Sequence, residues 1–190
     1  KLTGHNVIIT GGTKGIGRAI AETLAEEGCN IAICARNADD VSSAVASLSA
    51  KGVKVTGQAL DVADGDAFAA WINSVGEELS GIDAFVSNVS GGNAPGDAGW
   101  ISQFNYNILS AVHGVEACKP FSEKSANASV VMISTTAALE HFMNAGPYNA
   151  MKAGLLNYSG ALAQELGAKG VRVNAISPGP IFVEGGSWDK

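Results

Sequence analysis

The first candidates for chemistry are a tyrosine and a lysine spaced four residues apart, Tyr148 and Lys152. In a helix, residues with this spacing lie on one face, so the phenol and the ammonium would be neighbours. A free tyrosine has a pKa near ~10 and is a poor acid–base catalyst at neutral pH. A cation one turn away favours the phenolate and lowers that pKa toward the working range. Because the spacing alone is common by chance, its meaning depends on the surrounding elements.

A glycine-rich segment, Thr10–Gly17, follows a short β-branched run, Val7–Ile9. Gly11 would permit a tight turn, Gly15 would let the backbone approach a phosphate, and Gly17 would allow close packing of helix on strand. A helix that begins here presents unpaired N–H groups and its positive dipole end to a pyrophosphate. An ordinary glycine-rich turn is the alternative, but the position between the first strand and the first helix favours a dinucleotide site. The residues predicted to bind the dinucleotide here are Gly11, Thr13, Lys14, Gly15, Ile16 and Gly17.

The residues after the second predicted strand indicate which dinucleotide binds. An acidic residue ~20 positions past the loop would accept hydrogen bonds from the ribose 2′-hydroxyl of NAD. Here Ala35 is neutral, Arg36 follows it, and Lys14 adds a second cation. Two cations without a carboxylate suit a 2′-phosphate, so we predict NADP(H) in preference to NAD(H), with a solvated surface charge as the alternative for Arg36. Asp61 and Val62 would flank the adenine, although a plain N-cap is an equally simple explanation of the aspartate.

Apolar strands alternate with amphipathic helices along the chain. The predicted strands are 7–9, 31–35, 53–55, 82–86, 129–133 and 171–175, and the helical patterns cover 16–24, 41–48, 68–79, about 100–119 and 148–166. This alternation is typical of a parallel sheet covered on both faces. We predict a doubly wound α/β (Rossmann) sheet in three layers, as a single dinucleotide-binding domain over residues 1–190. The loop-like tail suggests that a C-terminal lid and a last strand lie beyond Lys190.

Composition excludes several other classes of protein. The chain has 190 residues, 46% of them hydrophobic and 16% charged, which is typical of a well-filled globular core. A net charge of −6 argues against a nucleic-acid or anionic-membrane surface. No apolar run approaches the ~18 residues of a membrane span. The three cysteines and three histidines lack disulfide or zinc spacing. We therefore expect a cytoplasmic protein without a bound metal.

Together, three motifs resemble those of the short-chain dehydrogenases/reductases. They are the TGxxxGxG loop at Thr10–Gly17, the YxxxK pair at Tyr148 and Lys152, and the dipeptide Pro178-Gly179 after the sixth strand. The resemblance covers nearly the whole chain and is strongest to members described as 3-oxoacyl-carrier-protein reductases. It implies NAD(P)(H)-dependent interconversion of a carbonyl and an alcohol, usually by a homotetramer, with a dimer as the other expected assembly.

The resemblance also implies roles for individual residues. Tyr148 would donate a proton to the carbonyl oxygen while hydride leaves the nicotinamide, and Lys152 would bind the nicotinamide ribose and tune the phenol. Asn107 matches the helix asparagine that anchors a proton-relay water, with Asn105 as its near rival. The family's cofactor contacts also fall on Asn88, and its contacts to the nicotinamide carboxamide fall on Pro178, Gly179 and Ile181.

Three positions depart from the family pattern. The substrate-orienting serine is replaced by Thr135, with Ser134 one step earlier. In an extended strand these two side chains point to opposite faces, so only one can reach the site, and we favour Thr135. After the fourth strand, Asn88 is followed by Val89 and Ser90 in place of smaller residues, and Val183 replaces a threonine near the nicotinamide.

These departures keep two other functions in consideration. One is a protein of this fold that binds the nucleotide as a sensor or scaffold and has little or no turnover. The other is a sugar-nucleotide epimerase or dehydratase, which we disfavour because such enzymes normally need a different glycine spacing and a longer C-terminal substrate domain. Trp188 would either cap an apolar substrate or pack the loop.

Overall fold

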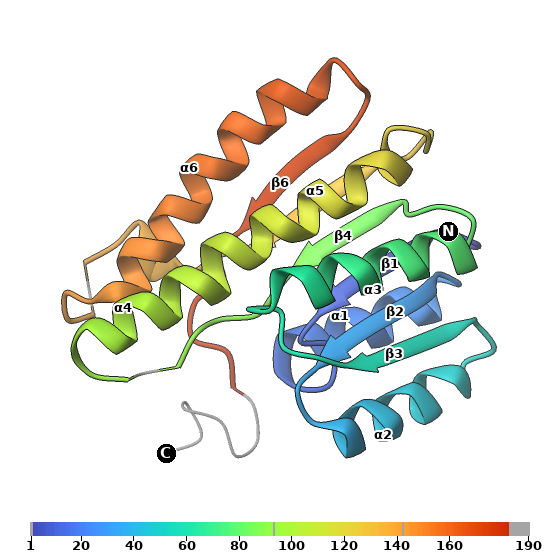
Figure 1. Ribbon diagram of the computed structural model, residues 1–190, viewed down its shortest axis with the longest axis horizontal. Coiled ribbons are helices and arrows are strands. Elements are labelled where there is room, and N and C mark those ends of the chain that lie inside the picture. Colours follow the sequence, from blue (N-terminus) through green and yellow to red (C-terminus); the bar gives the residue numbers. More distant parts are fainter. Residues whose placement is uncertain (1, 93, 142, 183–190) are drawn as a thin grey trace.

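Six parallel strands form one sheet in the computed structural model, which describes residues 2–92, 94–141 and 143–182 (Figure 1). Their spatial order is β3-β2-β1-β4-β5-β6, and every neighbouring pair is parallel. The predicted doubly wound α/β fold is confirmed. The strands are β1 (Asn6–Thr10), β2 (Asn30–Ala35), β3 (Val55–Ala59), β4 (Ala84–Ser87), β5 (Ser129–Ile133) and β6 (Arg172–Ile176).

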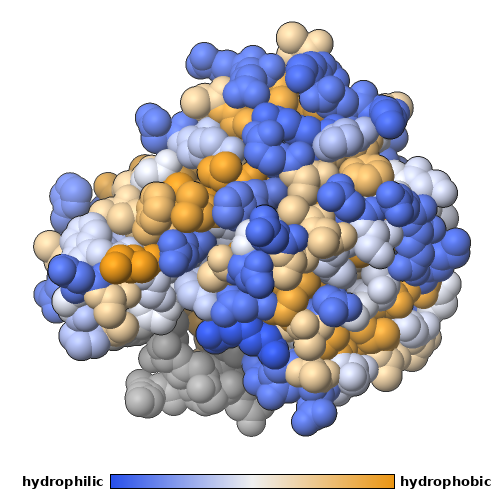
Figure 2. Space-filling view, in the orientation of Figure 1, coloured by the Kyte–Doolittle hydropathy of each residue, from blue (hydrophilic) through white to orange (hydrophobic). Residues whose placement is uncertain are grey.

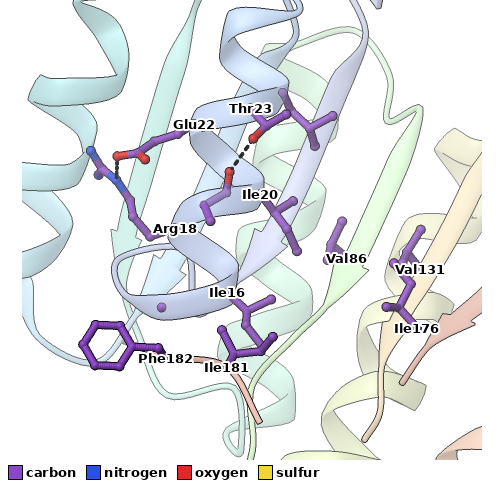
Figure 3. Close-up of a pocket in the computed structure, with 13 residues that line it drawn as sticks. Ile16, Arg18, Ile20, Glu22, Thr23, Val86, Val131, Ile176, Ile181 and Phe182 are labelled. Atoms are coloured by element: carbon purple, nitrogen blue, oxygen red, sulfur yellow. Dashed lines mark hydrogen bonds and ion pairs between the residues drawn. The ribbon is translucent and has the colours of Figure 1, made fainter. Parts of the chain in front are cut away.

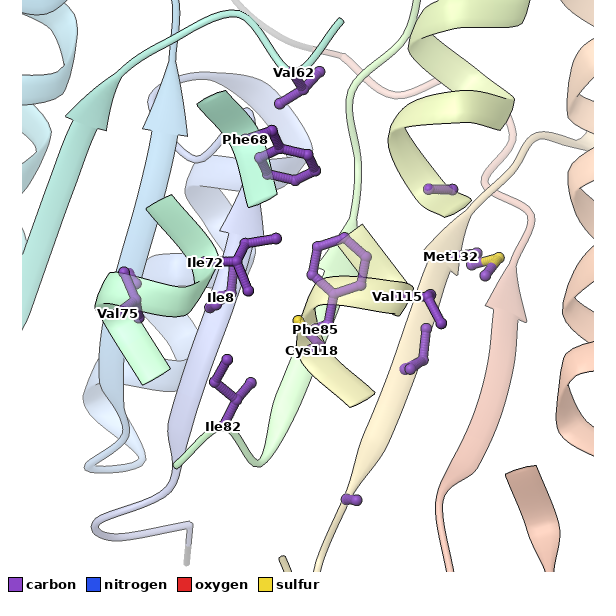
Figure 4. Close-up of a cluster of buried hydrophobic side chains, with 14 of the residues drawn as sticks. Ile8, Val62, Phe68, Ile72, Val75, Ile82, Phe85, Val115, Cys118 and Met132 are labelled. Carbon is purple, nitrogen blue, oxygen red and sulfur yellow. The ribbon is translucent and has the colours of Figure 1, made fainter. Parts of the chain in front are cut away.

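Each face of the sheet has its own hydrophobic core, because successive side chains on a strand point to opposite faces. On one face, Ile8 belongs to a cluster built mainly with α3 (Gly65–Glu78), α5 (Ser110–Ser122) and α6 (Pro147–Gly167). Phe68 and Phe85 lie at its centre, with ring centroids 6.5 Å apart (Figure 4). On the other face, Val7 and Ile9 pack with α1 (Gly15–Glu26) and α2 (Ala38–Ser49). The sheet is therefore the middle layer of three.

The helix expected near residues 100–119 is longer than predicted and has an interruption. It begins as α4 (Gly96–Phe104), passes through a π-helical turn at Asn105–Leu109, and continues as α5. A π turn inserts extra backbone and rotates the following residues relative to an ideal helix. Within it, Asn107 is 1% exposed, whereas Asn105 is partly exposed. Hydrophobic periodicity does not reveal such a turn, because the apolar face continues on both sides.

The third strand is displaced from its predicted position. The prediction placed it at residues 53–55, but β3 runs from Val55 to Ala59 and includes polar side chains. It is an edge strand, so one side is less covered and the apolar run is short. Gly57 lets β3 pack closely against α2, since a Cβ there would lie 2.6 Å from Val45 and 2.8 Å from Val41 of that helix. The other predicted elements occur where expected, with small shifts at their ends. No helix in the described ranges is long and apolar enough to cross a membrane.

Candidate active site

The site forms where the strand order reverses, between β1 and β4. In doubly wound sheets, ligands bind outside the carboxyl ends of the strands at this point. Asn88 joins the two strand ends: its backbone N–H donates to the Thr10 hydroxyl at 2.9 Å, and its Nδ2 donates to the Thr10 carbonyl at 3.0 Å. The glycine loop is thus fixed to β4 before any ligand arrives.

The glycine loop leads directly into α1 with an open helix end. Gly11 and Gly15 have φ values of 66° and 54°, a region that side-chain-bearing residues seldom adopt. The N-cap residue, Lys14, makes no side-chain capping bond, and the first turn of α1 holds no acidic residue. Its N–H groups therefore remain available to an anion. A Cβ on Gly17 would lie 2.3 Å from the Gly11 carbonyl oxygen and 2.5 Å from Asn88 Nδ2, so its close packing is against the loop itself and not a strand.

A cavity of about 450 Å³ opens beside this loop. Tyr106 donates its hydroxyl to Asp61 Oδ2 at 2.6 Å, which raises the pKa of the phenol, and the Arg36 guanidinium lies 5.8 Å from the centre of its ring. Lys14 forms an ion pair with Asp40 at 2.8 Å. The lining includes the predicted residues Gly11, Thr13, Lys14, Arg36, Asp61 and Val62.

Tyr106 and Asp40 are among the cavity residues that sequence reasoning missed. Tyr106 gave a usable signal, because an aromatic residue beside a predicted relay asparagine must lie near the site. Asp40 gave none, since its approach to Lys14 depends on how α2 packs. The prediction of two cations without a carboxylate is therefore wrong for Lys14, which pairs with Asp40. Arg36 has no carboxylate within ion-pair distance among the described residues.

Lys152 is buried at the carboxyl end of β5. Its side chain is 3% exposed, and its Nζ donates to the Ile133 carbonyl oxygen at 2.7 Å. Burial lowers the pKa of this amine from 10.5 to about 8. Tyr148 lies one turn earlier in the first turn of α6 and is half-buried. The structure therefore holds the ammonium firmly and places the phenol on the same helix, nearer the surface.

The two candidate hydroxyls after β5 have different surroundings. Ser134 Oγ is buried and donates to the Lys152 carbonyl oxygen at 3.0 Å, which links β5 to α6. Thr135 is 9% exposed and accepts from the Ala137 N–H at 3.3 Å, as the N-cap of a short 3-10 helix (Thr136–Ala138). An accepting hydroxyl keeps its own hydrogen for another partner. Of these two hydroxyls, Thr135 is thus the one whose hydrogen has no acceptor among the described residues.

Asn107 shows an unmatched polar atom in the interior. Its Nδ2 donates to the Gln103 carbonyl oxygen at 2.9 Å and to Gln103 Oε1 at 2.5 Å. Its Oδ1 is buried and has no hydrogen-bond partner among the described residues. Because an unpaired buried acceptor is costly, a donor such as water is expected there.

The residues after β6 lie farther from this cluster. Pro178 accepts the Thr136 N–H at 3.0 Å, and Gly179 is exposed. Ile181 lies beside Ile16 in an apolar trough of about 700 Å³ between α1 and strands β4 to β6, which Phe182 and Ile176 also line (Figure 3). The trough is the larger cavity, but its charged lining residues, Arg18 and Glu22, pair with each other at 2.7 Å. It therefore lacks the chemistry of the smaller site. Val183 and Trp188 lie outside the described residues.

Replacing Lys152 with methionine is expected to change the pH dependence of stability. Because the folded-state pKa is about 8 against 10.5, the unfolded chain holds a proton between these pH values that the folded chain has released. The free energy of unfolding of the native protein therefore rises as the pH increases from about 8 toward 10.5. Urea unfolding at about pH 7 and about pH 9.5 should show the native protein gaining ~2 kcal/mol relative to the variant.

Lys54→Met is the control for this experiment, because Lys54 is exposed. That variant should follow the native pH dependence. Parallel pH dependence in native protein and Lys152→Met would show that the buried amine titrates as it does in the unfolded chain.

The comparisons with known proteins agree with this geometry. Residues 5–185 match the family model for short chain dehydrogenases. The chain is 36% identical to isoepoxydon dehydrogenase patN of Penicillium expansum over 195 residues, which span 99% of this chain and 74% of that protein. It therefore belongs to the short-chain dehydrogenase family.

Solved structures show the same likeness. The L-sorbose reductase of Gluconobacter frateurii, complexed with NADPH and L-sorbose, superimposes with a TM-score of 0.90 and 32% identity, over 95% of this chain and 71% of that one. The carveol dehydrogenase of Mycobacterium avium, in complex with NAD, gives a TM-score of 0.87 and 26% identity, over 93% and 71%. Family and fold together define an oxidoreductase that uses a nicotinamide dinucleotide.

Proposed function

We propose that this protein interconverts a small-molecule carbonyl and a secondary alcohol by NADPH-dependent hydride transfer, with Tyr148 as the general acid and base. One observation carries the proposal: Lys152 is buried and fixed to the Ile133 carbonyl at the end of β5, one helical turn from Tyr148. Among the described residues Lys152 has no acidic partner, and a buried cation without one is energetically costly. Such groups cluster at functional sites.

The residues present fit a dinucleotide. The open end of α1 and the tight Gly11–Gly17 packing form a cradle for a pyrophosphate, and Arg36 lies in the neighbouring cavity. Asn107 Oδ1, which is buried and has no partner within the described ranges, supports a bound water beside it. When bound, the nicotinamide supplies or accepts the hydride. Pro178, Gly179 and Ile181 remain proposed contacts to its carboxamide.

Each of four polar side chains then has a role in the proposed reaction. Tyr148 gives its proton to the carbonyl oxygen as the alcohol forms, and takes it back in the reverse direction. Lys152 would hold the ribose hydroxyls of the cofactor, with its ammonium one helical turn from the Tyr148 phenol. Thr135 donates its free hydroxyl hydrogen to the same carbonyl oxygen, where negative charge develops. Asn107 Oδ1 accepts from the water that returns a proton toward Lys152.

The preference for NADPH is tested by Arg36→Ala. The guanidinium is exposed at the cavity and has no carboxylate within ion-pair distance in the part of the chain that the structure describes, so we propose that it pairs with a 2′-phosphate. Lys14 is partly neutralised by Asp40 and contributes less. The variant should bind NADPH about 10-fold to 100-fold more weakly, because charge-assisted contacts of this kind contribute ~1.5–3 kcal/mol, and NADH nearly as before. Fluorescence titration with both cofactors measures the difference.

Arg172→Ala is the matched control, because Arg172 is an exposed arginine on β6. It should leave both affinities unchanged. Equal weakening of NADPH and NADH in Arg36→Ala would contradict a 2′-phosphate contact and would favour a general role for the arginine, such as its stacking on Tyr106.

Assembly and location remain expectations of this proposal. Apolar side chains gather on the surface over α4 and α5 (Figure 2). On α4, Trp100, Ile101 and Phe104 are 46%, 60% and 42% exposed. Large exposed apolar residues of this kind support the predicted homo-oligomer, whether dimer or tetramer. A cytoplasmic location stays a prediction.

A further inference from the structure

Gln103, at the end of α4, is a buried amide whose hydrogen-bonding groups are all used. It is 1% exposed. Its Nε2 donates to the carbonyl oxygens of Gly91 and Gly92 at 2.9 and 3.1 Å. Its Oε1 accepts from Asn107 Nδ2 at 2.5 Å and from Ser90 Oγ at 3.4 Å. A leucine or methionine would fill such a core position without the cost of desolvating an amide, so the amide itself needs an explanation.

The orientation of this amide follows from its partners. Gly91 and Gly92 offer only carbonyl oxygens, which can accept but not donate, so Nε2 must face them. Oε1 must then face Asn107. The Gln103 main-chain carbonyl also accepts from Asn107, so Nδ2 of Asn107 has two acceptors on one side. The other end of that amide, Oδ1, is left turned away with no partner among the described residues.

The contacts also tie two walls of the site together. The segment Ser90–Gly92 follows β4 directly, and Ser90 lines the cofactor cavity. A Cβ on Gly91 would lie 2.9 Å from Cα and N of Gln103, so this segment packs on the α4 backbone itself. Gln103 therefore holds the cofactor-side loop and the relay asparagine in one rigid unit.

We propose that Gln103 is a positioning residue: it fixes the flip of the Asn107 amide so that Oδ1 faces the proton-relay water, and it holds the Ser90–Gly92 loop against α4. This inference rests on the proposed function for its catalytic consequence, whereas the fixed amide is a property of the protein alone. Gln103 itself is not among the residues that line the cofactor cavity.

The first test uses cofactor-free protein and does not depend on turnover. Side-chain amide resonances of ¹⁵N-labelled protein are assigned with Asn107→Ala, and their hydrogen exchange is measured. Gln103→Met should speed exchange of the Asn107 amide by about 10-fold, the effect of one lost hydrogen bond. Gln103→Glu retains an acceptor for the Asn107 amide but loses the donors to the loop. Exchange of the Asn107 side-chain amide should therefore stay slow, while exchange of the Gly91 and Gly92 backbone amides should become faster. Gln164→Met, exposed on α6, should change neither.

The second test is a double-mutant cycle on kcat with NADPH and a reducible carbonyl. Gln103→Met alone should lower kcat about 10-fold, and in an Asn107→Ala background it should lower kcat by less than about twofold, because it acts through Asn107. Additive losses, or an Asn107 amide that exchanges as in native protein, would overturn the inference. If the native protein has no turnover, the proposed function fails and the exchange measurement still decides the positioning role. If Gln103→Met does not fold, the exchange measurement on Gln103→Glu decides, and native exchange at Gly91 and Gly92 in that variant would overturn the inference.

Discussion

Tyr148→Phe is expected to lower the kcat of carbonyl reduction about 1,000-fold while changing the dissociation constant for NADPH by less than about threefold. Phenylalanine keeps the ring at the start of α6 and removes the one group that gives a proton to the carbonyl oxygen in the proposed reaction. Lys152 is held by Ile133, so its position should not depend on the phenol. Steady-state kinetics and fluorescence titration of NADPH separate the two effects.

Tyr158→Phe is the matched control for this experiment. It removes the same hydroxyl from the same helix, where burial raises the pKa of that phenol. Its kcat should equal the native value. A Tyr148→Phe protein that retains more than about a tenth of native kcat would show that proton transfer does not depend on this hydroxyl.

Gly17→Ala is expected to weaken NADPH binding by about 100-fold or more and to destabilise the protein by ~1–3 kcal/mol. The new Cβ would stand 2.3 Å from the Gly11 carbonyl oxygen and 2.5 Å from Asn88 Nδ2. Backbone atoms cannot move aside as a flexible side chain does, so α1 must shift away from the loop. That shift would move the open helix end from the position that the pyrophosphate occupies. Calorimetric titration and urea unfolding measure the two losses.

Gly160→Ala provides the comparison. This glycine also lies within a helix, α6, but a Cβ there would meet nothing within 4 Å. Alanine should leave NADPH affinity unchanged and raise stability by up to ~1 kcal/mol through its better helix propensity. If Gly17→Ala also binds NADPH as tightly as native protein, the glycine loop is not the pyrophosphate site.

The sheet and most of its elements could be predicted because each apolar run reports directly on a buried strand or helix face. Ile8 and Phe85 illustrate this, since both are fully buried where the pattern placed strands. The limits of β3 were predicted least well, because an edge strand needs fewer apolar residues and its limits then depend on pairing with β2. Helix ends moved for a similar reason, since capping and loop geometry set them.

The site was predictable where one residue type carries the chemistry and less so where packing decides it. Lys152 and Gly17 could be singled out by type and spacing. The preference for Thr135 over Ser134 stays a prediction. It is supported by the contact of the Ser134 hydroxyl with the Lys152 carbonyl oxygen, which only the packing of α6 on β5 creates. The roles of Asp40 and Gln103 depend on contacts between elements and on the π turn at 105–109. No sequence period encodes those features.

Hydride transfer itself gives the most direct test of the central claim. The native protein is incubated with NADPH that carries deuterium at the nicotinamide C4 position, together with a broad panel of ketones and aldehydes, and the products are analysed by mass spectrometry. We predict an alcohol that carries the deuterium on its former carbonyl carbon, formed by native protein and not by Tyr148→Phe. Tight NADPH binding with no label transferred to any carbonyl would contradict the proposed reaction and favour a nucleotide-binding sensor or scaffold.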